Sequence, residues 1–135
     1  MIALRFVAAL LLVVIGASAL AADRIEMTIT RNKEQIGTHT IAFVHDGARL
    51  HVDTRVEIAV SLAFLTVYRM LKTSRETWEE GRVVAYDATI DDNGTVSTIK
   101  ARPNGENMVV DGPDGRVTAP LGTMISGYWS DRTVE

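Results

Sequence analysis

The residues best suited to chemistry are a carboxylate and a phenol that the sequence pattern places on the same apolar face. Glu76 is predicted to lie opposite Tyr86, with both side chains directed inward among mostly apolar neighbours. An apolar interior in general raises the pKa of a carboxyl group, which suits general acid or base catalysis. The same pair can instead orient a ligand in a wet cavity, or fix strand pairing through hydrogen bonds.

Three more side chains extend this candidate ligand-binding set. His39 is predicted on the same face, and Tyr68 and Trp78 lie on the same strand as Glu76. Ser74 and Lys72 are further additions on that strand, and Lys72 or Arg75 is a candidate hydrogen-bond donor to Glu76. We assign no catalytic residue. We interpret the set as structural, with ligand contact as the alternative; the set is His39, Tyr68, Glu76, Trp78 and Tyr86.

Several kinds of site are excluded by what the chain lacks. It has no cysteine, which removes thiol nucleophiles, redox pairs and zinc-thiolate sites. His39, His45 and His51 are predicted on the inner face, at a turn and on the outer face, so they do not converge on a metal. The segment 91–94 lacks the alternating oxygen ligands of a calcium loop, and no Gly-x-Ser-x-Gly motif or phosphate-binding loop occurs. We expect no metal, no cofactor and no enzymatic activity.

The elements that must position these side chains are β-strands, because apolar residues recur at every second position after residue 22. From Leu50 to Val60 every even-numbered residue is apolar except Thr54. We predict strands at residues 24–31, 35–44, 48–60, 65–78, 82–91, 95–102 and 107–111, with a weaker one at 115–119. The predicted fold class is all-β, an antiparallel meander of seven or eight strands that forms a curved sheet or an incomplete β-barrel.

Short turns predict how these strands pair. The pairs Asp46-Gly47, Asn93-Gly94 and Asn104-Gly105 tolerate positive φ angles, so we place them at the centres of two-residue hairpin turns. We predict three-residue loops at 32–34 and 80–82, because a two-residue loop at the second place would turn Arg75 inward without a partner. The predicted pairs are Ile25 with Ile41, Ile41 with Val52, Glu76 with Tyr86, Ala88 with Ile99, and Ala101 with Met108. The segment 61–65 breaks the alternation and is left open between a bulge, a tight apolar bend and one helical turn.

The first 22 residues have the pattern of an export signal. Arg5 precedes the apolar run Phe6 to Ile15, and Ala19-Leu20-Ala21 supplies a cleavage motif. The run is too short to cross a bilayer comfortably, since a spanning helix needs about 20 apolar residues. We predict a signal helix cleaved near Ala21 and Ala22, a single domain over 23–135, a periplasmic or secreted location, and no stable transmembrane anchor after cleavage. The net charge of −3 is scattered along the chain, which indicates no nucleic-acid partner.

The order of several short motifs resembles that of a known family. These motifs are Gly37-Thr-His-Thr-Ile41, Val67-Tyr-Arg69, Glu76-Thr-Trp78, Glu80-Gly81-Arg82 and Thr89-Ile-Asp-Asp-Asn-Gly94. From about Ile25 to Trp129 the chain resembles an uncharacterised family of exported bacterial proteins, domain of unknown function 6134. The resemblance implies an antiparallel β-rich domain of a Gram-negative envelope and brings no activity or catalytic residue. Proteins of this type continue with further strands after Tyr128-Trp129, so this chain is expected to be a short member or to lack its C-terminal strands.

Three functions are compatible with these expectations. The first is a non-catalytic binding or carrier-like module whose concave apolar face accepts a lipid-like or other apolar small molecule. The second is a structural or interaction module of the envelope, which pairs an exposed edge strand with a partner protein or a second copy. The third, ranked last, is a hydrolase-type enzyme that uses Glu76, because no nucleophile or metal set supports it.

Overall fold

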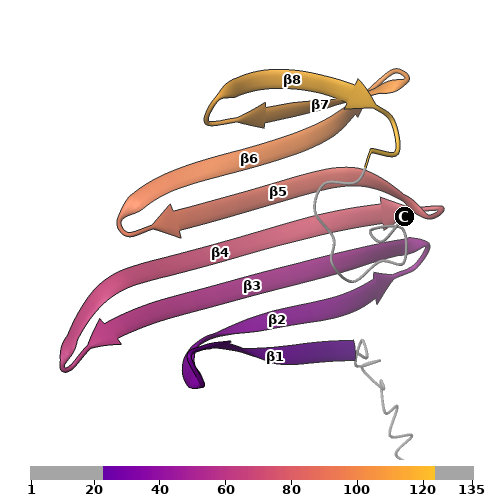
Figure 1. The fold of residues 1–135 in the computed structure, drawn as a ribbon. Helices are drawn as coiled ribbons and strands as arrows, with labels where there is room; N and C mark the ends of the chain where they lie inside the picture. Colours follow the sequence, from indigo (N-terminus) through magenta and orange to yellow (C-terminus); the bar gives the residue numbers. More distant parts are fainter. Residues whose placement is uncertain (1–22, 124–135) are drawn as a thin grey trace, which may run out of the picture.

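A single antiparallel sheet makes up the part of the chain that the structure, a computed structural model, describes, residues 23–123. Each strand pairs with the next one along the chain, so the sheet order follows the sequence (Figure 1). The strands are β1 (Asp23–Arg31), β2 (Glu34–Asp46), β3 (Arg49–Leu62), β4 (Leu65–Glu79), β5 (Arg82–Asp92), β6 (Thr95–Asn104), β7 (Asn107–Gly112) and β8 (Gly115–Pro120).

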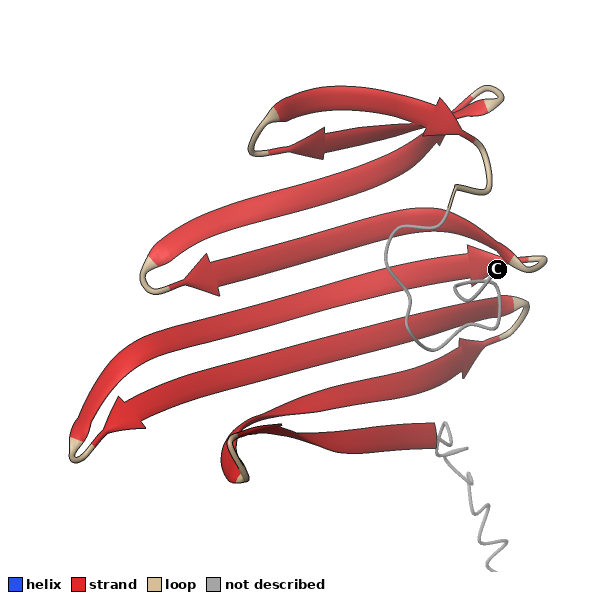
Figure 2. Ribbon diagram, viewed as in Figure 1, coloured by secondary structure: helices blue, strands red, loops and turns tan. Residues whose placement is uncertain are grey.

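The all-β meander predicted from the alternation is confirmed. Figure 2 shows strands joined by short turns, and no helix, throughout residues 23–123. All eight predicted strands are present, and their ends differ from the predicted ends by no more than two residues. Within this range the sheet is open, with β1 and β8 at its two edges. The predicted signal helix and any strand after residue 123 lie outside the described residues.

Two hairpins have a register different from the one predicted. The turns after β2 and β6 begin at a glycine, Gly47 or Gly105, which has a φ of 58° or 63°. This is the first central position of a type II′ turn, whereas we had placed both glycines at the second position. The observed pairs are Phe43 with Val52, Ile41 with Thr54, Ala101 with Val110, and Pro103 with Met108. A slip of two residues keeps every side chain on its predicted face, because the strand period is also two.

Two β-bulges preserve the pairs that we predicted from three-residue loops. The loops contain only two residues each, 32–33 and 80–81, and all four residues have positive φ. A register shift inside each hairpin then restores the predicted pairing. Ile25 therefore lies opposite Ile41, and Glu76 lies opposite Tyr86 and points inward. The pairing of Ala88 with Ile99 is also confirmed.

The segment that breaks the alternation combines two of the alternatives left open by the sequence. Ala63, with a φ of 56°, and Phe64 form a tight turn between β3 and β4. A register shift beside Val60 and Ser61 adds a bulge just before this turn. The segment contains no helical turn.

The core lies on one face of the sheet, as the alternation predicts. Its buried hydrophobic residues form two clusters, one around Val52 and Trp78 and the other around Tyr86 and Met108. Val52, Ala101 and Met108 have no exposed surface. The other face carries the charged and hydroxyl side chains of the same strands, so one face of the sheet is apolar and one is polar.

Candidate functional site

The apolar face of the sheet consists of a buried half and an open half. Along β4 the inner positions change from buried at Trp78, Glu76 and Ser74 to half-buried at Lys72 and Met70. We define the buried half by Ile41, Val52, Ser74, Glu76, Trp78, Val83, Tyr86, Ala88, Ala101 and Met108. We define the open half by Met27, Ile29, His39, Val56, Ile58, Met70, Lys72 and Ile90, none of which is buried. Solvent therefore reaches the inner side chains of the open half but not those of the buried half.

Three of the five predicted ligand-binding residues lie together in the buried half. The indole Nε1 of Trp78 donates a 2.8 Å hydrogen bond to Oε2 of Glu76, and Tyr86 lies directly opposite Glu76. Burial raises the pKa of the Tyr86 phenol, and its hydrogen bond with Ser74 partly opposes this rise. Glu76 is only 3 % exposed and Tyr86 only 2 %. Their burial favours the structural interpretation, in which the cluster fixes the pairing of β4 with β5; contact with a ligand stays a prediction.

The donors proposed for Glu76 on its own strand do not reach it. Arg75 points to the polar face, because neighbouring residues of a strand point to opposite faces, and it pairs there with Asp53. Lys72 is four residues away on the same face, about 13 Å along a strand. The prediction of a Lys72 or Arg75 hydrogen bond to Glu76 is therefore wrong, and the donor is Trp78.

The other two predicted residues lie apart from this cluster. His39 is on β2 in the open half, opposite Met27 and Val56. Tyr68 is eight residues from Glu76 along β4, about 26 Å at the rise of a strand. Its hydroxyl donates a hydrogen bond to Asp92, which is the main cause of the raised pKa of this phenol. The five residues thus occupy three places and do not form one binding site.

The side chain of Lys72 places a positive charge in the middle of the open half. Lys72 has the apolar Val56 and Ile90 as its cross-strand partners and is half-buried. Among residues 23–123, no carboxylate forms an ion pair with its ammonium group. An unpaired charge that is partly removed from water carries a desolvation cost, which an anionic ligand would offset.

The charge of this lysine is one of two causes that shift the pKa of His39. Burial, and then the positive charge of Lys72, lower the pKa of the His39 imidazole below its ordinary value of 6.5. At pH 7 His39 is therefore neutral, able to donate a hydrogen bond through one ring nitrogen and to accept one through the other. Together, Lys72 and His39 are polar groups that can orient the head of a ligand on an apolar surface.

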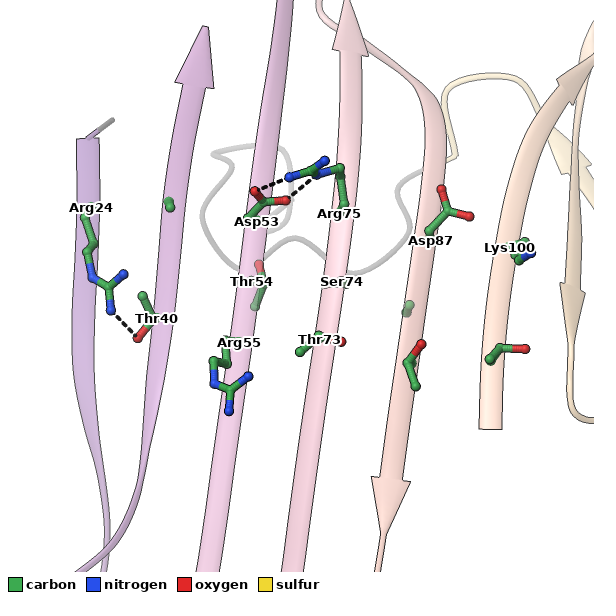
Figure 3. A pocket seen from close by; sticks show the side chains of 14 residues that line it. Arg24, Thr40, Asp53, Thr54, Arg55, Thr73, Ser74, Arg75, Asp87 and Lys100 are labelled. Carbon is green, nitrogen blue, oxygen red and sulfur yellow. Dashed lines mark hydrogen bonds and ion pairs between the residues drawn. The ribbon is translucent and has the colours of Figure 1, made fainter. Parts of the chain in front are cut away.

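The polar face of the sheet carries a hollow of about 510 Å³ (Figure 3). It extends across six strands, from Arg24 on β1 to Lys100 on β6. Threonine side chains line it at Thr40, Thr73, Thr89 and Thr98, in one row across the sheet that is interrupted by Arg55 on β3. A hollow on this face was not predicted. The predicted concavity of the apolar face stays a prediction.

Beside the threonines, a row of alternating charges crosses all eight strands. We call it the charge ladder; it consists of Arg24, Asp53, Arg75, Asp87, Lys100, Asp111 and Arg116, with Ala42 between the first two. Arg75 donates hydrogen bonds of 2.6 and 2.7 Å to the two carboxylate oxygens of Asp53, and Figure 3 shows this pair. Such opposite charges on neighbouring strands favour one register over a slipped one. The charge ladder is therefore best explained as a device that fixes pairing.

The charge ladder was not predicted from the sequence, and Lys72 was named only as an addition to the candidate ligand-binding set, not as one of its five main residues. The signal for the charge ladder is a run of opposite charges at outward positions, which becomes visible only once the register of every hairpin is known. The signal for Lys72 is a lysine at an inward position of an alternating strand. We had named it as a further addition to the inward polar set and as a partner for Glu76.

Two further properties of the described part bear on function. Residues 23–123 contain no group of three or more histidine, aspartate or glutamate side chains arranged to hold a metal ion. No helix in the same range is long and apolar enough to span a bilayer.

Comparison with known proteins identifies the family of the chain. Residues 27–135 match the family described as Domain of unknown function (DUF6134). The resemblance seen in the order of the motifs is therefore confirmed over most of the chain. No curated protein and no solved structure matches the chain.

Proposed function

The chain belongs to the DUF6134 family, for which no function is known, and from this premise we propose that it is a non-catalytic module that binds an anionic amphipathic molecule. The observation that carries the proposal is the half-buried residue Lys72 on the open half of the apolar face, whose ammonium group has no ion-pair partner among residues 23–123. An exported location, which the pattern of residues 1–22 predicts, is part of the proposal.

The open half has the two properties that such a ligand needs. Its apolar side chains, including Met27, Val56 and Ile58, offer surface whose removal from water is favourable at about 25 cal/mol per Å². Its single cation, Lys72, lies among them and not at their margin. A hydrocarbon chain would cover the apolar residues while an anionic head group pairs with the ammonium. A purely apolar ligand would leave this charge buried and unpaired.

The neutral His39 couples ligand binding to protons. An anion beside His39 and Lys72 would favour the protonated imidazole and raise its lowered pKa toward the ordinary value. Binding of an anionic amphiphile is therefore expected to take up protons near pH 6 and to release none. This proton uptake, measured by calorimetry in buffers of different ionisation enthalpy, disappears in the variant His39→Gln.

The decisive experiment compares two lysine variants of the full chain. Lys72→Met removes the charge and retains a long apolar side chain, and Lys100→Met makes the same change on the exposed polar face. Oleate is the probe, and its affinity is measured by displacement of a fluorescent fatty acid. We expect Lys72→Met to weaken oleate binding about tenfold, the worth of one hydrogen bond to a charged group, and Lys100→Met to leave it unchanged. Equal affinity in both variants would reject the proposal.

A second function is favoured by one observation at the sheet edge. β1 is an edge strand within residues 23–123, and its Ile25 and Met27 are 46 % and 39 % exposed. An exposed edge with apolar side chains suits the addition of a strand from a partner protein or a second copy. Either Met27 or Thr28 directs its backbone N–H away from the sheet. Proline at that position would remove the N–H donor and then abolish co-purification of the partner. Oleate binding by the Thr28→Pro chain distinguishes this function from the first.

A further inference from the structure

The β3–β4 hairpin extends beyond the sheet as an arm without neighbouring strands. The last pair between β2 and β3 is Gly37 with Ile58, and the last pair between β4 and β5 is Met70 with Asp92. Residues 59–69, which we call the β3–β4 arm, therefore continue as two strands that pair only with each other. At the base of the arm, the carbonyl of Arg69 also accepts a 2.8 Å hydrogen bond from the N–H of Asn93 in the next turn. Figure 1 shows the turn of this arm lying beyond the other turns at the same end of the sheet. At the rise of a strand the arm projects by roughly 15 Å.

The turn of the arm is apolar, unlike the three other turns at this end. Leu62, Phe64 and Leu65 are 68 %, 97 % and 62 % exposed. No charged residue occurs from 59 to 68. The other turns have the polar central residues 32–33 (Asn-Lys), 93–94 (Asn-Gly) and 113–114 (Pro-Asp). An exposed apolar cluster of this kind marks a surface that another phase or molecule covers.

Hydroxyl and then charged side chains follow the turn toward the sheet, with the apolar Val60 and Val67 between them. Directly behind the apolar turn, the hydroxyls of Ser61 and Thr66 lie 3.4 Å apart on the paired strands. Tyr68 follows, with its hydroxyl bonded to Asp92, and then Arg69, the first charged residue of the arm. The interface of a lipid bilayer has the same order, from hydrocarbon through ester groups to hydrated head groups, where aromatic and basic side chains are favoured.

We infer that the β3–β4 arm inserts its turn into the surface of a lipid bilayer. Hydrocarbon surrounds a convex apolar tip without needing a complementary groove, which suits the nearly complete exposure of Phe64. The insertion is shallow, because the outer edges of the two arm strands carry N–H and C=O groups that need water or head groups as partners. Only the turn and the Leu62–Leu65 pair enter the acyl region, within the depth of about 5–10 Å that interfacial segments reach.

The test uses the absence of cysteine from the chain, which gives every introduced thiol a single site. Ala63→Cys places a polarity-sensitive dye beside Phe64, and Lys33→Cys and Asp114→Cys place it at two of the polar turns. Each labelled full chain is mixed with vesicles of phosphatidylethanolamine and phosphatidylglycerol. The emission of the dye at position 63 is expected to shift to the blue and to be quenched by lipid-borne quenchers. Dyes at positions 33 and 114 keep their aqueous emission, although all three chains share the apolar segment Phe6 to Ile15.

Two further variants in the Ala63→Cys background sharpen the result. Phe64→Asp is expected to abolish the blue shift and to weaken the lipid-dependent signal about tenfold or more, as expected from the burial of one phenylalanine. Val96→Asp changes another exposed apolar residue, 62 % exposed, on β6 and leaves the signal unchanged. Far-ultraviolet dichroism verifies that both variants keep the sheet.

Two outcomes would overturn the inference. One is a dye at position 63 that stays aqueous while the full chain sediments with the vesicles, which would assign lipid binding to another segment. The other is a blue shift without vesicles that grows with protein concentration, which would assign the arm to a second copy of the chain.

Discussion

The two halves of the apolar face arise from one alternation pattern but differ in what their polar groups do. In the buried half, Glu76 accepts a hydrogen bond from Trp78, and Tyr86 bonds with Ser74. In the open half, Lys72 has no ion-pair partner within residues 23–123, and burial, followed by the charge of Lys72, lowers the pKa of His39. Polar groups that satisfy one another stabilise a fold, whereas a charge left uncompensated is typical of a site kept for a ligand. The comparison therefore separates a half whose polar groups satisfy one another from a half that we propose as the binding surface.

The largest expected effect distinguishes the halves by stability. Trp78→Ala removes a buried ring and the hydrogen-bond donor of Glu76, so we expect the free energy of unfolding to fall by about 3–5 kcal/mol. Met27→Ala in the open half removes a side chain that is already 39 % exposed, and its loss should stay below about 1 kcal/mol. Chemical denaturation measures both. Similar losses would show that the face is not divided in this way.

Removing the charge of Lys72 in the open half is expected to raise the free energy of unfolding, not to lower it. Without ligand, Lys72→Met should stabilise the fold by up to about 1 kcal/mol, because it removes from a half-buried residue a charge that has no ion-pair partner among residues 23–123, and adds apolar contact. Lys100→Met, on the exposed polar face, should change stability by less than about 0.5 kcal/mol. A clear destabilisation by Lys72→Met would show that its ammonium has a stabilising partner.

A smaller effect in the open half is expected from His39, in the pH dependence of the free energy of unfolding. The pKa of His39 is lower in the folded chain than its unfolded value of 6.5, so the unfolded state binds more protons between the two values. Stability is therefore expected to fall as the pH decreases through 6.5, until the lowered folded pKa is passed. In His39→Gln this part of the pH profile should be flatter. Denaturation series across this pH range measure it, and an unchanged slope would contradict the assignment.

The smallest effect is expected on the polar face. Asp53→Asn removes one end of the bidentate pair with Arg75, whose guanidinium group is largely exposed. Exposed pairs contribute about 0.2–1 kcal/mol, and salt screens them. The loss should therefore lie in this range at low ionic strength and shrink in high salt. A loss of several kcal/mol would make the charge ladder a main source of stability and not a device for register.

The strands and their faces could be predicted from the sequence, because they depend on local signals. A period of two fixes which side chains share a face, and Asn-Gly or Gly at a turn fixes where a strand ends. The registers of the hairpins at Gly47 and Gly105 could not be predicted, because Asp-Gly and Asn-Gly are compatible with glycine at either central position of a turn. The inward position of Glu76 was predicted correctly, although the bulge beside Thr77 that produces it was not foreseen.

The candidate site was less predictable, because burial depends on contacts that are distant in the sequence. Val52 and Val56 occupy equivalent positions in the alternation of β3, yet Val52 is fully buried and Val56 is not. For the same reason Glu76 and Trp78, selected as ligand-binding candidates, lie in the core, while Lys72 lies where a ligand can reach it. Knowing the face of a residue therefore does not reveal in which half of that face it lies.

The most direct test of the open half as a binding surface is the accessibility of single thiols in this cysteine-free chain. The variants are Met27→Cys in the open half and Ala101→Cys in the buried half, alkylated with and without oleate. We predict that the thiol at position 27 reacts rapidly and is protected by oleate, whereas the thiol at position 101 reacts slowly in both conditions. If oleate binds but leaves the reaction at position 27 unchanged, or if both thiols react at the same rate, the proposed division of the apolar face and its binding role are contradicted.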